Sequence, residues 1–141
     1  KILNLNLISC FKIIKSVVPK MIKKKYGRII NITSISSEIS MPLRSAYCSS
    51  KFGLLGLTKA SAVELAKHNI LINGVGPGVT KTELTVDVLG HKKMEEIAKN
   101  VPIGRLGTVE DISNIVIFMS SKKNTYILGQ NIIVDGGYTC V

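Results

Sequence analysis

The chain has 141 residues, of which 45% are hydrophobic and 20% charged, a composition that predicts one soluble globular domain with its own core. It contains no run of about 18 uncharged apolar residues and no visible signal peptide, which argues against a membrane as partner. The formal net charge of +10 raises nucleic acid or an anionic small molecule as a partner. The lysines are scattered, however, and aromatic residues do not interleave with them, so a solvated basic surface is favoured over nucleic-acid binding.

Cysteine and histidine residues give no sign of a metal site. Cys10, Cys48 and Cys140 are too few and too widely spaced for a zinc site or a disulfide scaffold. His68 and His91 have no partner at metal-ligand spacing. An odd number of cysteines without a signal peptide predicts a reducing, cytoplasmic location.

The first half of the chain is predicted to form a helix, a strand and a second helix. Apolar residues recur at steps of three and four over residues 2–25, which predicts a helix that Pro19 interrupts. Residues 28–34, RIINITS, form a short, β-branched and nearly uncharged run, as is typical of a buried parallel strand. After a polar loop, helical periodicity returns over residues 45–67.

The second half begins with a predicted buried strand over residues 69–76, which a Pro-Gly pair ends. Residues 79–90 are poorly patterned and mostly polar, and a helix is predicted over residues 91–100. Thr108 and Asp111 have the spacing of a capping box, with Asp in place of the usual Glu or Gln. This pair predicts the start of another helix.

That last helix is predicted over residues 109–121, and QNIIVDGG, residues 130–137, predicts a third strand with a glycine turn. The alternation of helix and strand is typical of a parallel α/β sheet with right-handed crossovers. In such sheets ligands bind beyond the carboxyl ends of the strands. The loops that follow the three strands are therefore candidates for a functional site.

The loop after the first strand leads to Tyr47 and Lys51, which lie four residues apart and so on one face of a helix. A lysine ammonium one turn away favours the phenolate form of a tyrosine, whose hydroxyl can then exchange a proton with an alcohol or carbonyl oxygen. Thr33 and Ser34, at the tip of the preceding strand, offer a hydroxyl that could hold the same oxygen. A Tyr/Lys pair at this spacing occurs on many helices, so the pair alone does not establish catalysis.

Five stretches of sequence add to this pair: YGRIINITS, SAYCSSKFGLLGLTKASAVELA, INGVGPGVTKTEL, IGRLGTVEDI and GQNIIVDGG. Together they resemble the central and C-terminal sequence of the short-chain dehydrogenase/reductase family, and most closely its 3-oxoacyl-(acyl carrier protein) reductases of fatty acid biosynthesis. The Tyr-x-x-x-Lys motif is weakly specific by itself, but its combination with the serine spacing and the GPGVTKTEL turn is specific. The resemblance implies an α/β fold, namely the C-terminal half of a doubly wound, parallel-sheet Rossmann fold with three layers.

The resemblance implies four catalytic residues. Tyr47 would be the general acid that protonates a carbonyl oxygen as hydride arrives, or the base in the reverse direction. Lys51 would support the Tyr47 phenolate, and both side chains would also contact the cofactor. Ser34, which fits the spacing to Tyr47 better than Thr33 does, would hold the substrate oxygen. Asn6 matches a helix asparagine that anchors a water between the lysine and solvent, although without the family it is an ordinary polar residue of a helix.

Further cofactor contacts are implied for the loop after the second strand. Pro77 and Gly78 would form a wall of the nicotinamide pocket, the backbone at Thr80 would meet the carboxamide, and Thr82 would lie near the pyrophosphate. The implied cofactor is NADP or NAD, and we favour NADPH. No metal is implied.

The family's N-terminal half, with its glycine-rich turn and the residue that selects NAD or NADP, is absent from this sequence. We therefore expect residues 1–141 to form a single, partial domain in which RIINIT is an edge strand. Family habit predicts a homo-oligomer, either a dimer or a tetramer. The alternatives are a truncated, inactive relative that acts only in assembly, a dehydrogenase of steroids or sugars, and a nucleic-acid binder.

The segments in which the family varies its substrate pocket have a mixed character here. Ile39, Met41 and Leu84 favour an apolar chain or ring, whereas Lys81 and Arg44 could meet an anionic carrier. We expect a carbonyl or alcohol substrate, and specifically a 3-oxoacyl thioester linked to acyl carrier protein.

Overall fold

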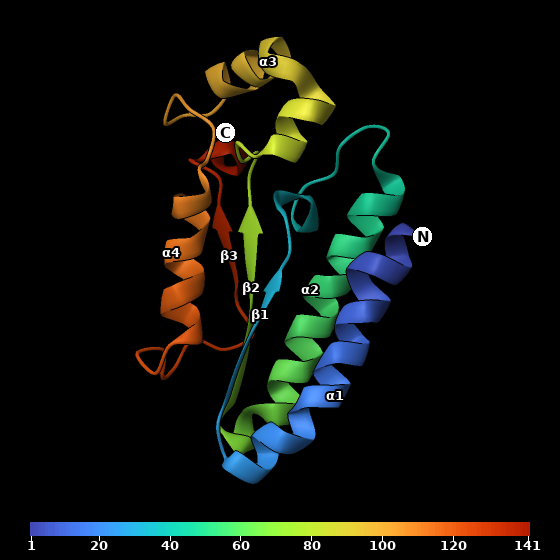
Figure 1. Ribbon diagram of the computed structural model, residues 1–141, viewed down its shortest axis with the longest axis vertical. Coiled ribbons are helices and arrows are strands. Elements are labelled where there is room, and N and C mark those ends of the chain that lie inside the picture. Colours follow the sequence, from blue (N-terminus) through green and yellow to red (C-terminus); the bar gives the residue numbers. More distant parts are fainter.

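The computed structural model describes residues 1–141 in full and contains one parallel sheet (Figure 1). Strands β1 (Gly27–Ile32), β2 (Ile70–Pro77) and β3 (Asn131–Val134) lie in the order β1-β2-β3, and both neighbouring pairs run parallel. The central strand β2 is buried along nearly its whole length, which explains its continuous apolar run. β1 is an edge of the sheet, as the sequence predicts.

Helices cover both faces of this sheet (Figure 1). α1 (Ser9–Lys24) and α2 (Ser45–Leu65) lie on one face and α4 (Val109–Ser120) on the other, while α3 (Glu83–Lys99) lies beyond the carboxyl ends of the strands. The three layers confirm the predicted α/β architecture. None of these helices combines the length and the apolar character that crossing a bilayer requires.

The first predicted helix is present, with a change of winding near its start. A turn of π-helix at Asn4–Ile8 precedes α1. The predicted interruption at Pro19 is wrong, since α1 continues through this residue to Lys24. Lys25 then ends the helix in the left-handed conformation, with φ at 51°. A π-turn leaves the regular α-helical hydrogen-bond pattern, and such turns are frequent at functional sites.

The structure corrects the prediction for residues 79–90, which fold largely into the first part of α3. Thr82 is the N-cap of this helix, and its side chain accepts a hydrogen bond from the backbone N–H of Thr85 at 3.2 Å. The helix breaks at Gly90, where φ is 71° and ψ is 160°, and then resumes. The helical pattern is weak here because side chains such as Leu84, which is 72% exposed, lie over a cavity instead of packing against the sheet.

The predicted capping box at the start of α4 is confirmed. The Thr108 hydroxyl accepts a hydrogen bond from the backbone N–H of Asp111 at 3.2 Å, and the Asp111 carboxylate accepts one from the backbone N–H of Thr108 at 2.7 Å. Arg105 also donates to both oxygens of this carboxylate, at 2.6 and 3.0 Å. The loop before α4 is therefore fixed to the first turn of the helix.

The core lies between α2 and the sheet. Ala62 of α2 packs with Ile70 and Ile72 of β2, and all three are fully buried. Burying each isoleucine side chain contributes about 1.5–3 kcal/mol. This packing fixes α2 against β2 and so sets where the amino-terminal end of α2 lies.

Candidate active site

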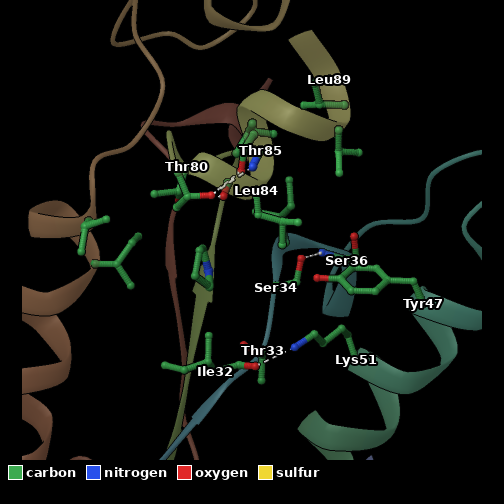
Figure 2. Close-up of a pocket in the computed structure, with 18 of the residues that line it drawn as sticks. Ile32, Thr33, Ser34, Ser36, Tyr47, Lys51, Thr80, Leu84, Thr85 and Leu89 are labelled. Carbon is green, nitrogen blue, oxygen red and sulfur yellow. Dashed lines mark hydrogen bonds between the residues drawn. The ribbon is translucent and has the colours of Figure 1, made fainter. Parts of the chain in front are cut away.

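A cavity of about 810 Å³ opens at the carboxyl ends of β1 and β2, among residues of α2, α3 and α4 (Figure 2). Its lining includes seven of the eight residues predicted for the site: Ser34, Tyr47, Lys51, Pro77, Gly78, Thr80 and Thr82. The eighth, Asn6, lies outside this lining. The cavity is at the end of the sheet where ligands bind in parallel α/β folds.

Ser34 follows β1 in an extended conformation and is buried. Its Oγ accepts a hydrogen bond from the backbone N–H of Ser36 at 3.0 Å and so caps the short 3-10 helix Ile35–Ser37. Because that bond uses a lone pair, the hydroxyl hydrogen of Ser34 remains available for a ligand oxygen in the cavity. The neighbouring Thr33 instead donates its hydroxyl to Asn131 at 2.6 Å. This difference supports Ser34 over Thr33 as the reactive hydroxyl.

Tyr47 and Lys51 project from the first turns of α2 into the same cavity (Figure 2). The hydroxyl end of the Tyr47 ring points toward Ser34. Lys51 places its Nζ 5.7 Å from the centroid of that ring and donates a hydrogen bond to the backbone carbonyl of Ile32 at 2.8 Å. The ammonium is thus close to the ring and is oriented by the last residue of the edge strand.

Burial lowers the pKa of Lys51 below the ordinary value of 10.5, because the charged ammonium is partly removed from water. Cys10 on α1 acts in the opposite direction, since a thiolate there favours the ammonium. A lysine in such surroundings gives up water contacts and relies on protein or ligand oxygens to solvate its charge. The Ile32 carbonyl is one such oxygen.

Asn6 lies in the π-turn before α1 and contacts the back of α2. Its Nδ2 donates to the hydroxyl of Ser50 at 3.1 Å, and Ser50 in turn donates to the backbone carbonyl of Tyr47 at 2.6 Å. The predicted residue is therefore connected to the helical turn that carries the tyrosine. The water contact implied for it stays a prediction.

The loop after β2 forms the opposite wall of the cavity. A side chain at Gly78 would place its Cβ 2.8 Å from the Cα of Asp135, so only glycine fits at this position without a shift of the backbone. Thr80 pairs with Gly107 in an isolated parallel bridge and also donates its hydroxyl to the Gly78 carbonyl at 3.1 Å. The segment that ends at Thr82 is thus held by the loop that precedes α4.

The lining of the cavity includes apolar residues that the sequence did not predict. Met41 and Leu84 line it as predicted, and so does Arg44, whereas Ile39 and Lys81 do not. The unpredicted apolar members are Ile32 and Ile35, next to Ser34, and residues on α3, α4 and the loop after β2: Val79, Val88, Leu89, Val109, Ile112 and Val116. Within α3 the spacing Leu84–Val88 is a helical signal that could have identified this wall.

The geometry of the cavity agrees with the proteins that resemble this chain in sequence. A family model described as enoyl-(acyl carrier protein) reductase matches residues 1–139. The 3-oxoacyl-[acyl-carrier-protein] reductase FabG of Rickettsia bellii (strain RML369-C) is 41% identical over 141 residues, which are 100% of this chain and 58% of that protein. The chain belongs to the short-chain dehydrogenase/reductase family.

Solved structures of short-chain dehydrogenases/reductases superpose closely on this chain. Acetoin dehydrogenase YohF from Salmonella typhimurium matches with a TM-score of 0.86 and 34% identity, over 99% of this chain and 54% of that chain. ElxO with NADP bound matches with a TM-score of 0.90 and 33% identity, over 96% of this chain and 56% of that chain. The present chain thus spans about half the length of the proteins it matches.

Proposed function

We propose that this chain carries the catalytic residues of an NAD(P)-dependent short-chain reductase that interconverts a carbonyl and a secondary alcohol. The observation that carries the proposal is the convergence of Ser34, Tyr47 and Lys51 on one cavity beyond the carboxyl ends of the strands. Two hydroxyls and an ammonium facing the same space can bind and protonate a carbonyl oxygen while hydride is added to the carbonyl carbon.

The residues present fit a nicotinamide nucleotide. The Lys51 ammonium and the hydroxyl of Thr82 are donors that match ribose and phosphate oxygens, and Pro77 and Gly78 offer a wall with little side-chain bulk. When bound, such a cofactor supplies or accepts the hydride. NADPH is the form we favour, in line with the NADP-bound relative.

In the reducing direction, Ser34 donates a hydrogen bond to the substrate carbonyl oxygen and Tyr47 transfers its hydroxyl proton to the same oxygen. The carbonyl carbon takes the hydride, so the product is a secondary alcohol. Lys51 favours the phenolate that remains on Tyr47. Asn6 is proposed to hold a water through which the site regains its proton.

A 3-oxoacyl thioester is the substrate that we propose. Met41, Leu84, Val88 and Leu89 give the cavity an apolar wall for an acyl chain, and Arg44 adds a positive charge for an anionic carrier such as acyl carrier protein. The FabG relative bears the name of that activity. Steroid, sugar and enoyl substrates are the competing classes.

The test is a comparison of substrates with the full-length protein, read from the absorbance of NADPH or NADH. A 3-oxoacyl thioester should give a higher kcat/KM than an enoyl thioester, acetoin, a ketosteroid or a ketosugar, and NADPH should serve better than NADH. Highest activity on one of the other substrates would contradict the proposed substrate. NADPH binding without turnover of any of them would favour the inactive assembly partner.

The assembly proposal rests on the exposed apolar surface of the two long helices and the turn before them. The side chains concerned are Leu5, Phe11, Ile13, Phe52 and Val63, which are 44–80% exposed. We propose that these helices pack in a homo-oligomer, a dimer or a tetramer, whose mass in solution is the test. We also propose a cytoplasmic location, in line with three free cysteines.

A further inference from the structure

Asn131, the first residue of β3, connects this strand to the distant segment that contains Ser34. Its Oδ1 accepts the hydroxyl hydrogen of Thr33 at 2.6 Å, and its Nδ2 donates to Ser37 Oγ at 3.1 Å and to Glu38 Oε1 at 2.8 Å. Thr33 and Ser37 lie immediately before and shortly after Ser34, and both are buried. One amide side chain therefore contacts the Ser34 loop on both sides.

This contact passes over the central strand of the sheet. β2 lies between β3 and β1, and Gly74 is paired with Asn131 on one side and with Asn31 on the other. A Cβ at Gly74 would lie 2.6 Å from Asn131 Oδ1, and one at Gly76 would lie 3.1 Å from the Thr33 hydroxyl oxygen. Both glycines leave the space that Asn131 needs to reach Thr33.

The bonds continue directly to Ser34. Ser37 donates its hydroxyl to the Ser34 carbonyl at 2.5 Å, and its backbone N–H donates to the same carbonyl at 3.0 Å. Asn131 thus fixes the hydroxyl of Ser37, which in turn fixes the backbone of Ser34. Its bond to Thr33 holds the residue that precedes Ser34. The side chain of Ser34 can then keep one orientation toward Tyr47 across the cavity (Figure 2).

We propose that Asn131 is a positioning residue that holds Ser34 in place for the reaction. The inference rests on the proposed function, in which Ser34 binds the substrate oxygen. Asn131 does not line the cavity, so its effect on catalysis passes through Ser34. A displacement of a catalytic group by about 1 Å can lower a rate by about 100-fold.

The variants separate this role from simple stabilisation of the sheet. Asn131→Ala removes all three bonds, whereas Asn131→Asp keeps an acceptor for Thr33 but places a carboxylate beside Glu38. Adding Glu38→Gln to Asn131→Asp restores a donor at that contact. Gln130→Ala is the matched control, because this neighbouring side chain is exposed and bonds only within its own loop.

Two readouts are needed, both on the full-length protein. The first is kcat with a 3-oxoacyl thioester, together with the Kd of NADPH. Asn131→Ala and Asn131→Asp should each lower kcat by about 10- to 100-fold with the NADPH Kd nearly unchanged. Glu38→Gln should recover part of that loss in the Asp variant, because it removes the repulsion at residue 38 but does not restore the donor to Ser37. The second is amide hydrogen exchange over residues 34–38, which should be about 10-fold faster in Asn131→Ala and unchanged in Gln130→Ala.

A kcat that is unchanged in a folded Asn131→Ala protein would overturn the inference, even if the melting temperature falls. If the alanine variant does not fold, the recovery of kcat by Glu38→Gln in the Asp variant decides, and its failure counts against the role. If the unmodified protein has no reductase activity, the proposed function fails. Hydrogen exchange then decides alone whether Asn131 holds the Ser34 loop.

Discussion

Lys51 shows how strongly one side chain depends on its surroundings. Its ammonium is partly buried, 5.7 Å from the Tyr47 ring centroid and hydrogen-bonded to the Ile32 carbonyl. Burial lowers its pKa, and Cys10 partly offsets this effect. We therefore expect Lys51 to titrate below 10.5, and to titrate lower still in Cys10→Ala.

Carbon-13 NMR of the lysine side chains across a pH series measures this directly, and the signal lost in Lys51→Met gives the assignment. A Lys51 signal that titrates at or above 10.5 would contradict the burial that we describe. An unchanged midpoint in Cys10→Ala would contradict the influence of the thiol.

For single residues, the sequence predicts which side chains belong to the site better than it predicts their contacts. Tyr47 and Lys51 could be paired because helical periodicity puts residues four apart on one face. The link from Thr33 to Asn131 could not, since those residues are 98 positions apart and meet only because β2 carries glycine between them. Spacing along the chain carries no information about such a crossing.

At the scale of elements, the break in α3 depends on Gly90. Its φ of 71° and ψ of 160° lie in a region that is almost restricted to glycine, so Gly90→Ala should destabilise the fold by about 1–3 kcal/mol. Gly56→Ala is the matched control: this glycine is in the middle of α2 with nothing within 4 Å of an added Cβ. It should stabilise the fold by about 0.5–1 kcal/mol.

Urea unfolding of both variants gives the two free energies of unfolding. An alanine at position 90 that leaves the free energy of unfolding unchanged would show that the chain adopts another conformation there. Loss of stability in Gly56→Ala would contradict the open space described at that position.

The hydrogen bonds at the start of α4 predict that the free energy of unfolding depends on pH in the acid range. Hydrogen bonds from Arg105 and from the Thr108 backbone hold the pKa of Asp111 well below its ordinary value of 3.8. The unfolded chain therefore binds a proton at a pH where the folded chain does not. The stabilisation is present above about pH 4 and is lost as the pH falls below it.

Asp111→Asn should consequently flatten the decline of stability between about pH 5 and pH 2, measured by urea unfolding at each pH. Glu96→Gln, in the exposed pair with Lys93, is the control and should leave the profile close to that of the unmodified protein. Equal acid sensitivity of Asp111→Asn and the unmodified protein would count against a stabilising role for the hydrogen bonds of Asp111 with Arg105 and Thr108.

Among the elements, those with regular patterns could be predicted. The three strands, α1, α2 and α4 follow from periodicity, apolar runs and the capping box at Thr108 and Asp111. The first part of α3 offers only the spacing of Leu84 and Val88 as a signal, because both side chains are mostly exposed and face a cavity. A helix that packs on no core leaves only a weak pattern.

For the whole molecule, the order of the strands decides which residues share the site. Parallel strands have their carboxyl ends on the same side of the sheet. The loops after β1 and β2 therefore meet there and bring Ser34, Tyr47 and Thr80 around one cavity. The edge position of β1 could be predicted from the family resemblance, because the half of the fold that would pair with this strand is absent from the sequence. The shape of the cavity could not, because it depends on α3.

The central claim is that Tyr47 acts as the acid or base for a substrate oxygen. Its most direct test is kcat of Tyr47→Phe in the full-length protein with NADPH and a 3-oxoacyl thioester, with the Kd of NADPH measured in parallel. We predict a loss of kcat of about 100- to 10,000-fold while the Kd changes little, because only the hydroxyl is removed. A Tyr47→Phe protein that retains its full kcat would contradict the account.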